Sequence, residues 1–148
     1  MAVGCDHRAV DVKNTAASLL RARGWAVEDM GTNGPESVDY PDIAERVARA
    51  VASGRAVAGV LSCGTGIGMS IAANKVRGVR AALAADAAAA RMARMHNDAN
   101  VLVVASSVSR ATLEEMLDAF LETEFEGGRH QRRVDKIGRL EQCGGDEQ

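Results

Sequence analysis

The sequence predicts an α/β fold in which a parallel sheet of five strands is covered by helices on both faces. Short apolar runs that are typical of strands alternate along the chain with amphipathic segments of helical period, which indicates parallel strands joined by helices. The run over 57–62 is apolar at nearly every position, as expected of a strand buried on both faces. With 148 residues and no internal repeat, the chain suits a single domain.

Glycines and a proline mark the ends of the helices predicted in the first half of the chain. Gly24 and Gly54 each follow a segment of helical period, and Pro41 stands in the first turn of the second segment, where proline is tolerated. The predicted elements are strands at 2–5, 25–28 and 57–62, helices at 10–23 and 40–53, and a loop at 31–35.

The second half continues the alternation and ends in a basic helix. Ser109 is a predicted N-cap, Gly127 and Gly128 form a predicted hinge, and residues 96–98 are expected to break the preceding helix. The predicted elements are a glycine-rich loop at 63–68, helices at 69–75, 86–95, 109–123 and 129–140, and strands at 79–83 and 100–105. The domain therefore spans 1–141, and the tail at 142–148 is predicted to be disordered.

Composition argues against several kinds of partner. The net charge is −2 and only four residues are aromatic, so the chain lacks both the basic surface that nucleic acid requires and the side chains that stack on its bases. We expect no membrane segment and no secretion signal. The three cysteines lack paired spacing, which favours reduced thiols and a cytoplasmic location. We therefore expect a small ligand held by polar groups.

Ligands of open parallel sheets bind beyond the carboxyl ends of the strands. This rule selects the residues that follow three predicted strands, namely Cys5-Asp6-His7, the loop at 63–68 and the residues after Ala105. The turn that carries His96 and Asn97 precedes a strand, so it should lie at the opposite edge of its own sheet. If this turn takes part in the chemistry, a second subunit supplies it.

The glycine-rich loop Cys63-Gly64-Thr65-Gly66-Ile67-Gly68 is the strongest chemical signal. Alternating glycines let successive backbone N–H groups turn toward one point, which makes a pocket for a phosphate or a developing oxyanion. Cys63 opens the loop, where neighbouring amides favour the thiolate form that acts as a base or nucleophile. The alternatives are a tight strand-to-helix turn and a small buried cysteine. Nucleotide binding is disfavoured, because the loop follows the wrong strand and lacks the Gly-Lys-Ser/Thr ending.

Histidines and arginines in polar segments add further candidates. His7 and His96 could each serve as a general acid or base, or be solvated loop residues. Arg129 and Arg133 share a helix face, which suits either a phosphate clamp or a solvated basic surface. A metal site built from the cysteines, Asp6 and the histidines lacks the spacing of ligand pairs, so no metal is predicted.

Six motifs occur together in a recognisable order. They are Gly4-Cys5-Asp6-His7, Asp39-Tyr40-Pro41, the loop at 63–68, Ile71-Ala72-Ala73-Asn74-Lys75, His96-Asn97-Asp98-Ala99-Asn100, and the run at 127–133. Through these motifs the chain resembles the type B ribose-5-phosphate isomerases, in the family shared with galactose-6-phosphate isomerase subunits. The resemblance covers about residues 2–141.

The resemblance implies a Rossmann-like three-layer sandwich that forms a homodimer or tetramer, with active sites between subunits. It implies aldose–ketose isomerisation of a sugar phosphate through an enediolate, without metal or cofactor. By resemblance, Cys63 is the base and His96 opens the furanose ring, while Thr65 and the amides of Gly64, Gly66, Ile67 and Gly68 hold the enediolate oxygen. Asp6, Tyr40 and Asn97 would contact sugar hydroxyls, and His7, Arg129 and Arg133 would hold the phosphate.

Two departures leave the substrate open. Relatives often have an arginine just after the fifth strand, where this chain reads Ala105-Ser106-Ser107-Val108-Ser109-Arg110, and its segment 85–88 lacks their bulkier polar residues. A four- or six-carbon sugar phosphate is therefore an alternative to ribose 5-phosphate. The alternatives of other classes are a non-catalytic sugar-phosphate-binding subunit and a thiol-dependent redox protein in which Cys63 pairs with Cys5.

Overall fold

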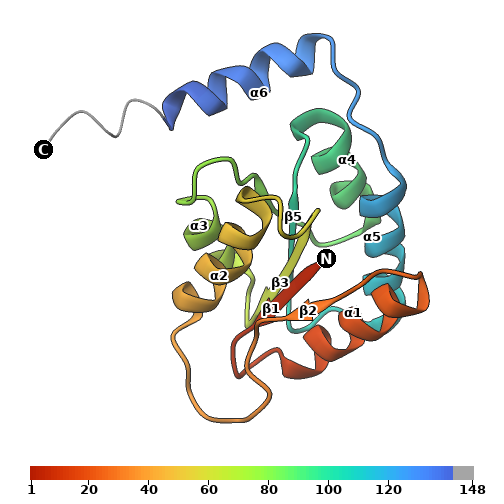
Figure 1. Cartoon of the computed structure of the whole chain (residues 1–148). Coiled ribbons are helices and arrows are strands. Elements are labelled where there is room, and N and C mark those ends of the chain that lie inside the picture. Colours follow the sequence, from red (N-terminus) through yellow and green to blue (C-terminus); the bar gives the residue numbers. More distant parts are fainter. Residues whose placement is uncertain (142–148) are drawn as a thin grey trace, which may run out of the picture.

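The computed structural model describes residues 1–141, and the tail predicted to be disordered, 142–148, lies outside the described residues. Strands and helices alternate from the N-terminus until two helices follow each other at the end (Figure 1). The elements are β1 (Ala2–Cys5), α1 (Val10–Ala22), β2 (Glu28–Asp29), α2 (Tyr40–Ala52), β3 (Gly59–Cys63), α3 (Ile67–Ala73), β4 (Ala81–Leu83), α4 (Ala87–Asn97), β5 (Val101–Ala105), α5 (Arg110–Glu122) and α6 (Arg129–Leu140).

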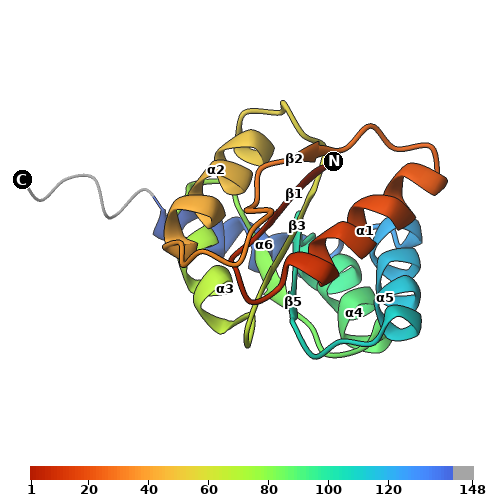
Figure 2. The same ribbon diagram turned by 90° about the horizontal axis from the view of Figure 1, so that it is seen from below.

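The five strands form one parallel sheet in the order β2-β1-β3-β5-β4. One apolar cluster packs α1, α4 and α5 against one face of the sheet, and a second packs α2 and α3 against the other. Figure 2 shows these two helical layers on either side of the sheet. The predicted three-layer α/β fold is therefore confirmed.

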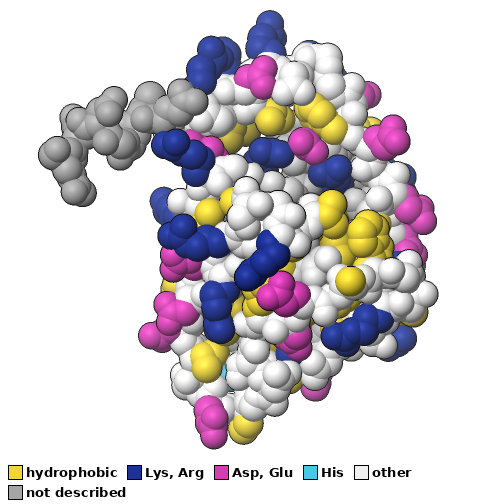
Figure 3. Space-filling view, in the orientation of Figure 1, with side chains coloured by type: hydrophobic (Ala, Val, Ile, Leu, Met, Phe, Trp, Pro, Cys, Tyr) yellow, Lys and Arg dark blue, Asp and Glu magenta, His cyan; other side chains and the backbone are white. Residues whose placement is uncertain are grey.

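Helix α6 belongs to neither layer. It contacts the end of α4 and crosses the molecule above the sheet, as Figure 1 shows. Its far end is tied to the turn after α3, because the Arg77 guanidinium donates to the backbone oxygen of Glu141 at 2.9 Å and the Glu141 carboxylate accepts from the Gly78 N–H at 3.0 Å. Basic side chains project along α6 at the top of Figure 3, and acidic ones are scattered below them. None of the helices within residues 1–141 has the length and apolarity needed to cross a membrane.

The edge strand β2 differs from the prediction. The apolar segment 25–28 was expected to pair, but the sheet takes up Glu28 and Asp29, which pair with Ala2 and Val3 of β1. The Trp25 N–H bonds to the Leu20 oxygen and so helps to close α1. The chain therefore reaches the sheet only at Glu28, and hydrogen bonding at the end of α1 overrides the apolar pattern.

Two helix boundaries also differ. Helix α3 begins at Ile67 rather than at residue 69, because Gly66 takes a left-handed conformation with φ 78° that ends the loop. Helix α4 does not break at His96 but continues through Asn97, and Asp98, with φ 46°, ends it. His96 and Asn97 are therefore fixed in a last helical turn rather than in a loop. The predicted cap is correct, since the Ser109 hydroxyl accepts from the Thr112 N–H.

A buried lysine ties α1 to the edge of the sheet. The Lys13 side chain is fully buried, and its ammonium donates to the Asp29 carboxylate and to the Asn33 side-chain oxygen. A buried ammonium needs such partners, because its desolvation costs several kcal/mol. Asp29 is therefore a stabilising residue whose loss leaves an uncompensated charge in the core.

We expect Asp29→Asn to lower the free energy of unfolding by about 3 kcal/mol, because the Lys13 ammonium loses its counter-charge. Urea denaturation of the wild type and the variant measures this difference. Glu28→Gln is the matched control, since it removes a neighbouring carboxylate that forms an exposed ion pair with Arg55. Equal destabilisation by the two variants would contradict the role given to Lys13.

Candidate active site

The strand order reverses direction between β1 and β3, and a crevice forms beyond the carboxyl ends of strands at such a point. The Asp6 N–H donates to the Ser62 oxygen at 3.3 Å, which joins the end of β1 to the end of β3. The segments that follow β1 and β3 therefore lie side by side. They carry Asp6, His7 and the loop that begins at Cys63.

The Cys63 thiol is wrapped by its own loop. Cys63 is the last residue of β3, is 5% exposed, and its Sγ accepts from the Gly66 N–H at 3.2 Å. A Cβ on Gly66 would lie 2.5 Å from Cδ1 of Leu83, so both the left-handed backbone and the space at this position require glycine. The thiol therefore lies against a backbone N–H at the point where the loop turns.

Thr65 and Tyr40 flank the same loop. The Thr65 side chain is exposed, and its Oγ1 accepts from the Ile67 N–H at 3.3 Å. The Tyr40 ring lies directly against Gly68, where a Cβ would come within 2.6 Å of Cζ of the tyrosine. The first turn of α3 thus presents backbone and hydroxyl groups beside a phenol. This places Tyr40, Thr65, Ile67 and Gly68 in one cluster with Cys63.

The segment after β1 brings an acid, an imidazole and a guanidinium to this cluster. Asp6 is buried, and its Oδ1 accepts from the Arg8 N–H at 2.9 Å. The His7 Nδ1 accepts from the Val38 N–H at 3.4 Å, which leaves the proton of a neutral His7 on Nε2. Arg8 lies beside Gly64, 3.4 Å from where a Cβ on that glycine would stand. Sequence reasoning did not single out Arg8, and its only signal is its position next to Asp6 and His7.

Cys5 differs from Cys63 although both stand at the carboxyl ends of strands. Burial raises the pKa of the Cys5 thiol to about 11, against the smaller opposing effect of Lys13. Its Sγ faces the Thr32 oxygen at 3.6 Å, whereas Cys63 faces Gly66, and both thiols are free. Cys5 is therefore a protonated core residue, and this arrangement does not favour a redox pair of the two cysteines.

His96, Asn97, Arg129 and Arg133 do not join this cluster within one chain. His96 and Asn97 end α4 just before β5 begins, so they lie at the amino-terminal edge of the sheet. Arg129 and Arg133 lie on the first turns of α6, which contacts α4 above that edge (Figure 1). The residues expected to form one site are thus divided between opposite edges of the sheet, as the strand directions required.

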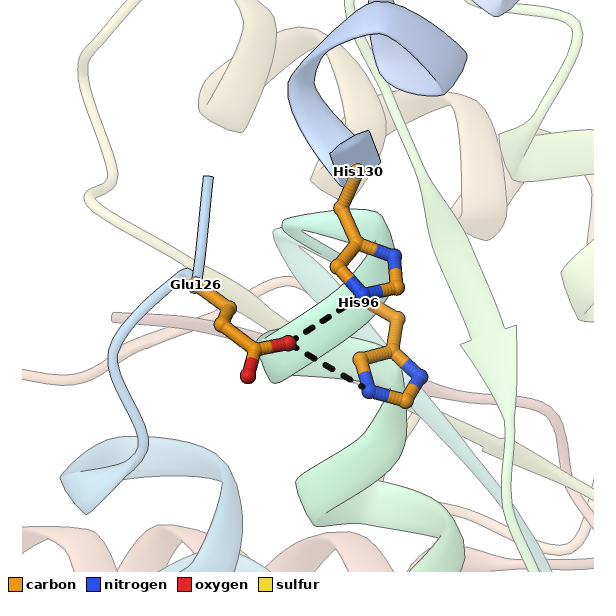
Figure 4. A group of neighbouring side chains, drawn as sticks. All are labelled: His96, Glu126 and His130. Carbon is orange, nitrogen blue, oxygen red and sulfur yellow. Dashed lines mark ion pairs between the residues drawn. The ribbon is translucent and has the colours of Figure 1, made fainter. Parts of the chain in front are cut away.

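Glu126 and His130 accompany His96, and the sequence analysis assigned a role to neither (Figure 4). The His96 and His130 rings are stacked, with centroids 4.1 Å apart and planes 5° from parallel. The Glu126 Oε2 lies 3.1 Å from the His130 Nε2 and 3.7 Å from the His96 Nε2. Burial, aided by the charges of His96 and Arg129, lowers the pKa of His130, so that ring is neutral near pH 7.

These three side chains are the group within residues 1–141 that comes nearest to a metal site. Their ligand atoms all lie within 4.8 Å of one another. An imidazole binds a metal along a lone pair that lies in the plane of its ring, however, and two stacked parallel rings do not direct their lone pairs to one point. The arrangement fits two stacked rings that share one carboxylate better than it fits a metal centre.

Two hollows lie at opposite ends of the strands, one at their amino ends and one at their carboxyl ends. A groove of about 860 Å³ runs along α6 and is lined by polar residues that include Asn74, Arg80 and Asn97, with Ile137 and Leu140 on the helix side. A smaller hollow of about 490 Å³ contains Thr65 and is lined by small and hydroxyl side chains that include Ala85, Ser107 and Thr112. The groove is therefore lined by Asn97, which neighbours His96, and the smaller hollow by Thr65 of the Cys63 loop.

The chain is similar to known proteins over nearly its whole length. A family model described as Ribose/Galactose Isomerase matches residues 1–137. The chain is 46% identical over 143 residues to ribose-5-phosphate isomerase B of Escherichia coli, covering 96% of each protein. It is also 42% identical over 143 residues to D-erythrulose-4-phosphate isomerase of Pectobacterium atrosepticum, covering 95% of this chain and 94% of the relative.

Solved structures match over nearly the whole chain as well. Ribose-5-phosphate isomerase B of Clostridium thermocellum superposes with a TM-score of 0.95 at 47% identity, covering 97% of this chain and 98% of that one. The enzyme of Mycoplasma genitalium with bound ribulose-5-phosphate superposes with a TM-score of 0.91 at 42% identity, covering 95% of each chain. These similarities extend through every motif that carried the resemblance, and the chain belongs to the Ribose/Galactose Isomerase family.

Proposed function

We propose that this chain is an aldose–ketose isomerase of sugar phosphates and that it interconverts ribose 5-phosphate and ribulose 5-phosphate. The observation that carries the proposal is the Cys63 thiol, which lies within a loop of backbone amides at the switch point of a parallel sheet. Relatives named for this reaction align with nearly the entire chain. A purely sugar-binding subunit would have no need of a thiol in this position.

The chemistry assigned to this loop is the movement of one proton between two carbons. The Cys63 thiolate takes the proton from C2 of the open-chain aldose, and the electron pair moves onto the carbonyl oxygen at C1 to form an enediolate. Backbone amides at Gly64, Gly66, Ile67 and Gly68, with the Thr65 hydroxyl, stabilise that oxygen. Return of the proton to C1 and transfer of the C2 hydroxyl proton to the C1 oxygen complete the ketose. Every electron stays within the sugar, so the step needs no redox cofactor.

Residues around the loop hold the remainder of the substrate. The buried Asp6 and the Tyr40 phenol bind sugar hydroxyls from the side of Cys63, and Asn97 does so from the other cluster. His7, whose Nε2–H remains available, binds the phosphate with Arg129 and Arg133. A phosphate held far from the reacting carbons orients them against the base, which turns binding energy into rate.

The complete site requires a second copy of the chain. His96 and Arg133 lie at the opposite sheet edge from Cys63, and both edges present exposed apolar side chains that a partner would cover, including Ile67 and Ile71 on α3 and Ile137 and Leu140 on α6. A homodimer, or a tetramer built from such dimers, brings the α4–α6 cluster of one chain to the Cys63 loop of the other. The free thiol that the reaction needs is compatible with a reducing cytoplasm.

The experiment that tests this function is a comparison of initial rates on four-, five- and six-carbon sugar phosphates with the purified chain alone. We expect ketose to form from ribose 5-phosphate with the highest kcat/KM, because the clusters provide three groups for hydroxyls and three for one phosphate. Faster turnover of erythrose 4-phosphate would instead assign to this chain the four-carbon reaction for which the Pectobacterium atrosepticum relative is named. Absence of ketose from every sugar phosphate would support a non-catalytic subunit.

We expect Cys63→Ala to lower kcat on ribose 5-phosphate by about a hundredfold or more, because the variant lacks the base. Binding of the sugar phosphate should persist, since the phosphate and hydroxyl ligands remain, and calorimetric titration measures it. Cys5→Ala is the matched control, because it removes a thiol at the end of the neighbouring strand that faces the core. Full activity of Cys63→Ala would refute the assignment of the base.

A further inference from the structure

The linker between α5 and α6 is fastened to the end of α4 at the position of Glu126. The Glu126 N–H donates to the Met95 oxygen at 3.0 Å, in the residue before His96. The next residue, Gly127, turns the chain back with φ 68°, and its oxygen accepts from the His130 N–H at 2.9 Å. Glu126 and His130 are thus set against His96 by backbone hydrogen bonds, not by side-chain contacts alone.

His130 forms a fixed support for the His96 ring. Its side chain is 5% exposed, whereas that of His96 is 26% exposed, so the inner ring is held by packing and the outer ring is accessible. The rings are stacked at 4.1 Å. The Arg129 Nε–H donates to the Nε2 of His130 at 3.4 Å, and the Glu126 Oε2 lies 3.1 Å from the same nitrogen.

The same carboxylate faces the Nε2 of His96 at 3.7 Å, and Figure 4 shows the other ring nitrogen on the far side of the ring from Glu126. A carboxylate beside one imidazole nitrogen favours the tautomer that carries the proton there and leaves the lone pair on the other nitrogen. We propose that Glu126 is a positioning residue that keeps the proton of His96 on Nε2, so that Nδ1 is the atom that exchanges protons with the sugar. This inference rests on the proposed function and on the ring opening that the family resemblance assigns to His96.

Ring opening through Nδ1 balances without any other reactant. The neutral Nδ1 takes the proton of the anomeric hydroxyl, the bond between C1 and the ring oxygen breaks, and the C1 aldehyde forms. The imidazolium then returns the proton to the former ring oxygen, which becomes a hydroxyl. Glu126 stabilises the imidazolium between these two transfers, as a carboxylate does for a catalytic histidine elsewhere. Contacts of this kind shorten when substrate is bound, so a separation of 3.7 Å in the free chain is sufficient.

Glu126→Gln tests the proposal by removing the charge while keeping the size of the side chain. From ribose 5-phosphate we expect kcat to fall about tenfold or more, with KM little changed, because Glu126 acts through His96 and not on the substrate. On erythrose 4-phosphate the fall should be smaller, because the C4 oxygen of this aldose carries the phosphate and cannot close a furanose ring. An equal fall on both aldoses would overturn the role in ring opening.

Glu124→Gln is the matched control, since it removes the same charge from the same linker at an exposed position. We expect the rates of this variant to equal those of the wild type on both aldoses. Melting temperatures of all three proteins show whether they are equally folded. A loss of activity in Glu124→Gln equal to that in Glu126→Gln would contradict a role specific to Glu126.

The tautomer of His96 can be measured without any activity. In protein labelled with ¹⁵N-histidine, the imidazole nitrogen shifts distinguish the Nε2–H form from the Nδ1–H form, and a His96→Asn sample assigns the signals among the three histidines. We expect the Nε2–H form in the wild type and a shift toward the Nδ1–H form in Glu126→Gln. The same tautomer in both would overturn the inference. A wild type that makes no ketose would instead refute the proposed function and leave the tautomer result standing.

Discussion

The direction of the strands is the constraint on which the other features of this molecule depend. All five strands are parallel, so their carboxyl ends share one edge of the sheet, and the segments that enter the strands share the other. Cys63 ends β3 and His96 lies just before β5, so one chain cannot bring them together. The second copy that we propose for a complete site follows from this topology rather than from any single contact. Helix α6, which belongs to neither helical layer, contacts α4 at the edge where His96 lies.

Within each cluster, backbone geometry does most of the positioning. The left-handed turn at Gly66 directs an N–H to the Cys63 sulfur, and the lack of a side chain at Gly68 admits the Tyr40 ring. At the other edge, the N–H of Glu126 fastens the linker to the last turn of α4. These contacts hold the groups that we assign to proton transfer on rigid elements, as such a role requires. They also distinguish two cysteines that both end strands. The Cys5 thiol is packed in the core, whereas the Cys63 thiol accepts from a backbone N–H of its own loop.

Much of the fold could be predicted from sequence because helix ends and buried strands have local signals. Gly24, Pro41 and Ser109 mark helix termini, and the apolar run of β3 marks a central strand. The edge strand was misplaced because its pairing depends on hydrogen bonds to Met1 and Val3, which are distant in sequence. The roles inferred for Glu126 and His130 depend on where a linker folds back onto another helix, and no local pattern encodes that. The division of the site between two edges was predictable, since it follows from strand direction alone.

A mixing experiment tests most directly the claim that two chains share each site. Cys63→Ala and His96→Asn chains carrying different tags are unfolded together and refolded, and ribose 5-phosphate turnover is compared with that of each variant alone. Each variant should be nearly inactive by itself. Random pairing makes half of the dimers hybrids with one intact site of two, so the mixture should recover about a quarter of wild-type activity. A mixture that contains hybrids but remains as inactive as its components would contradict the account.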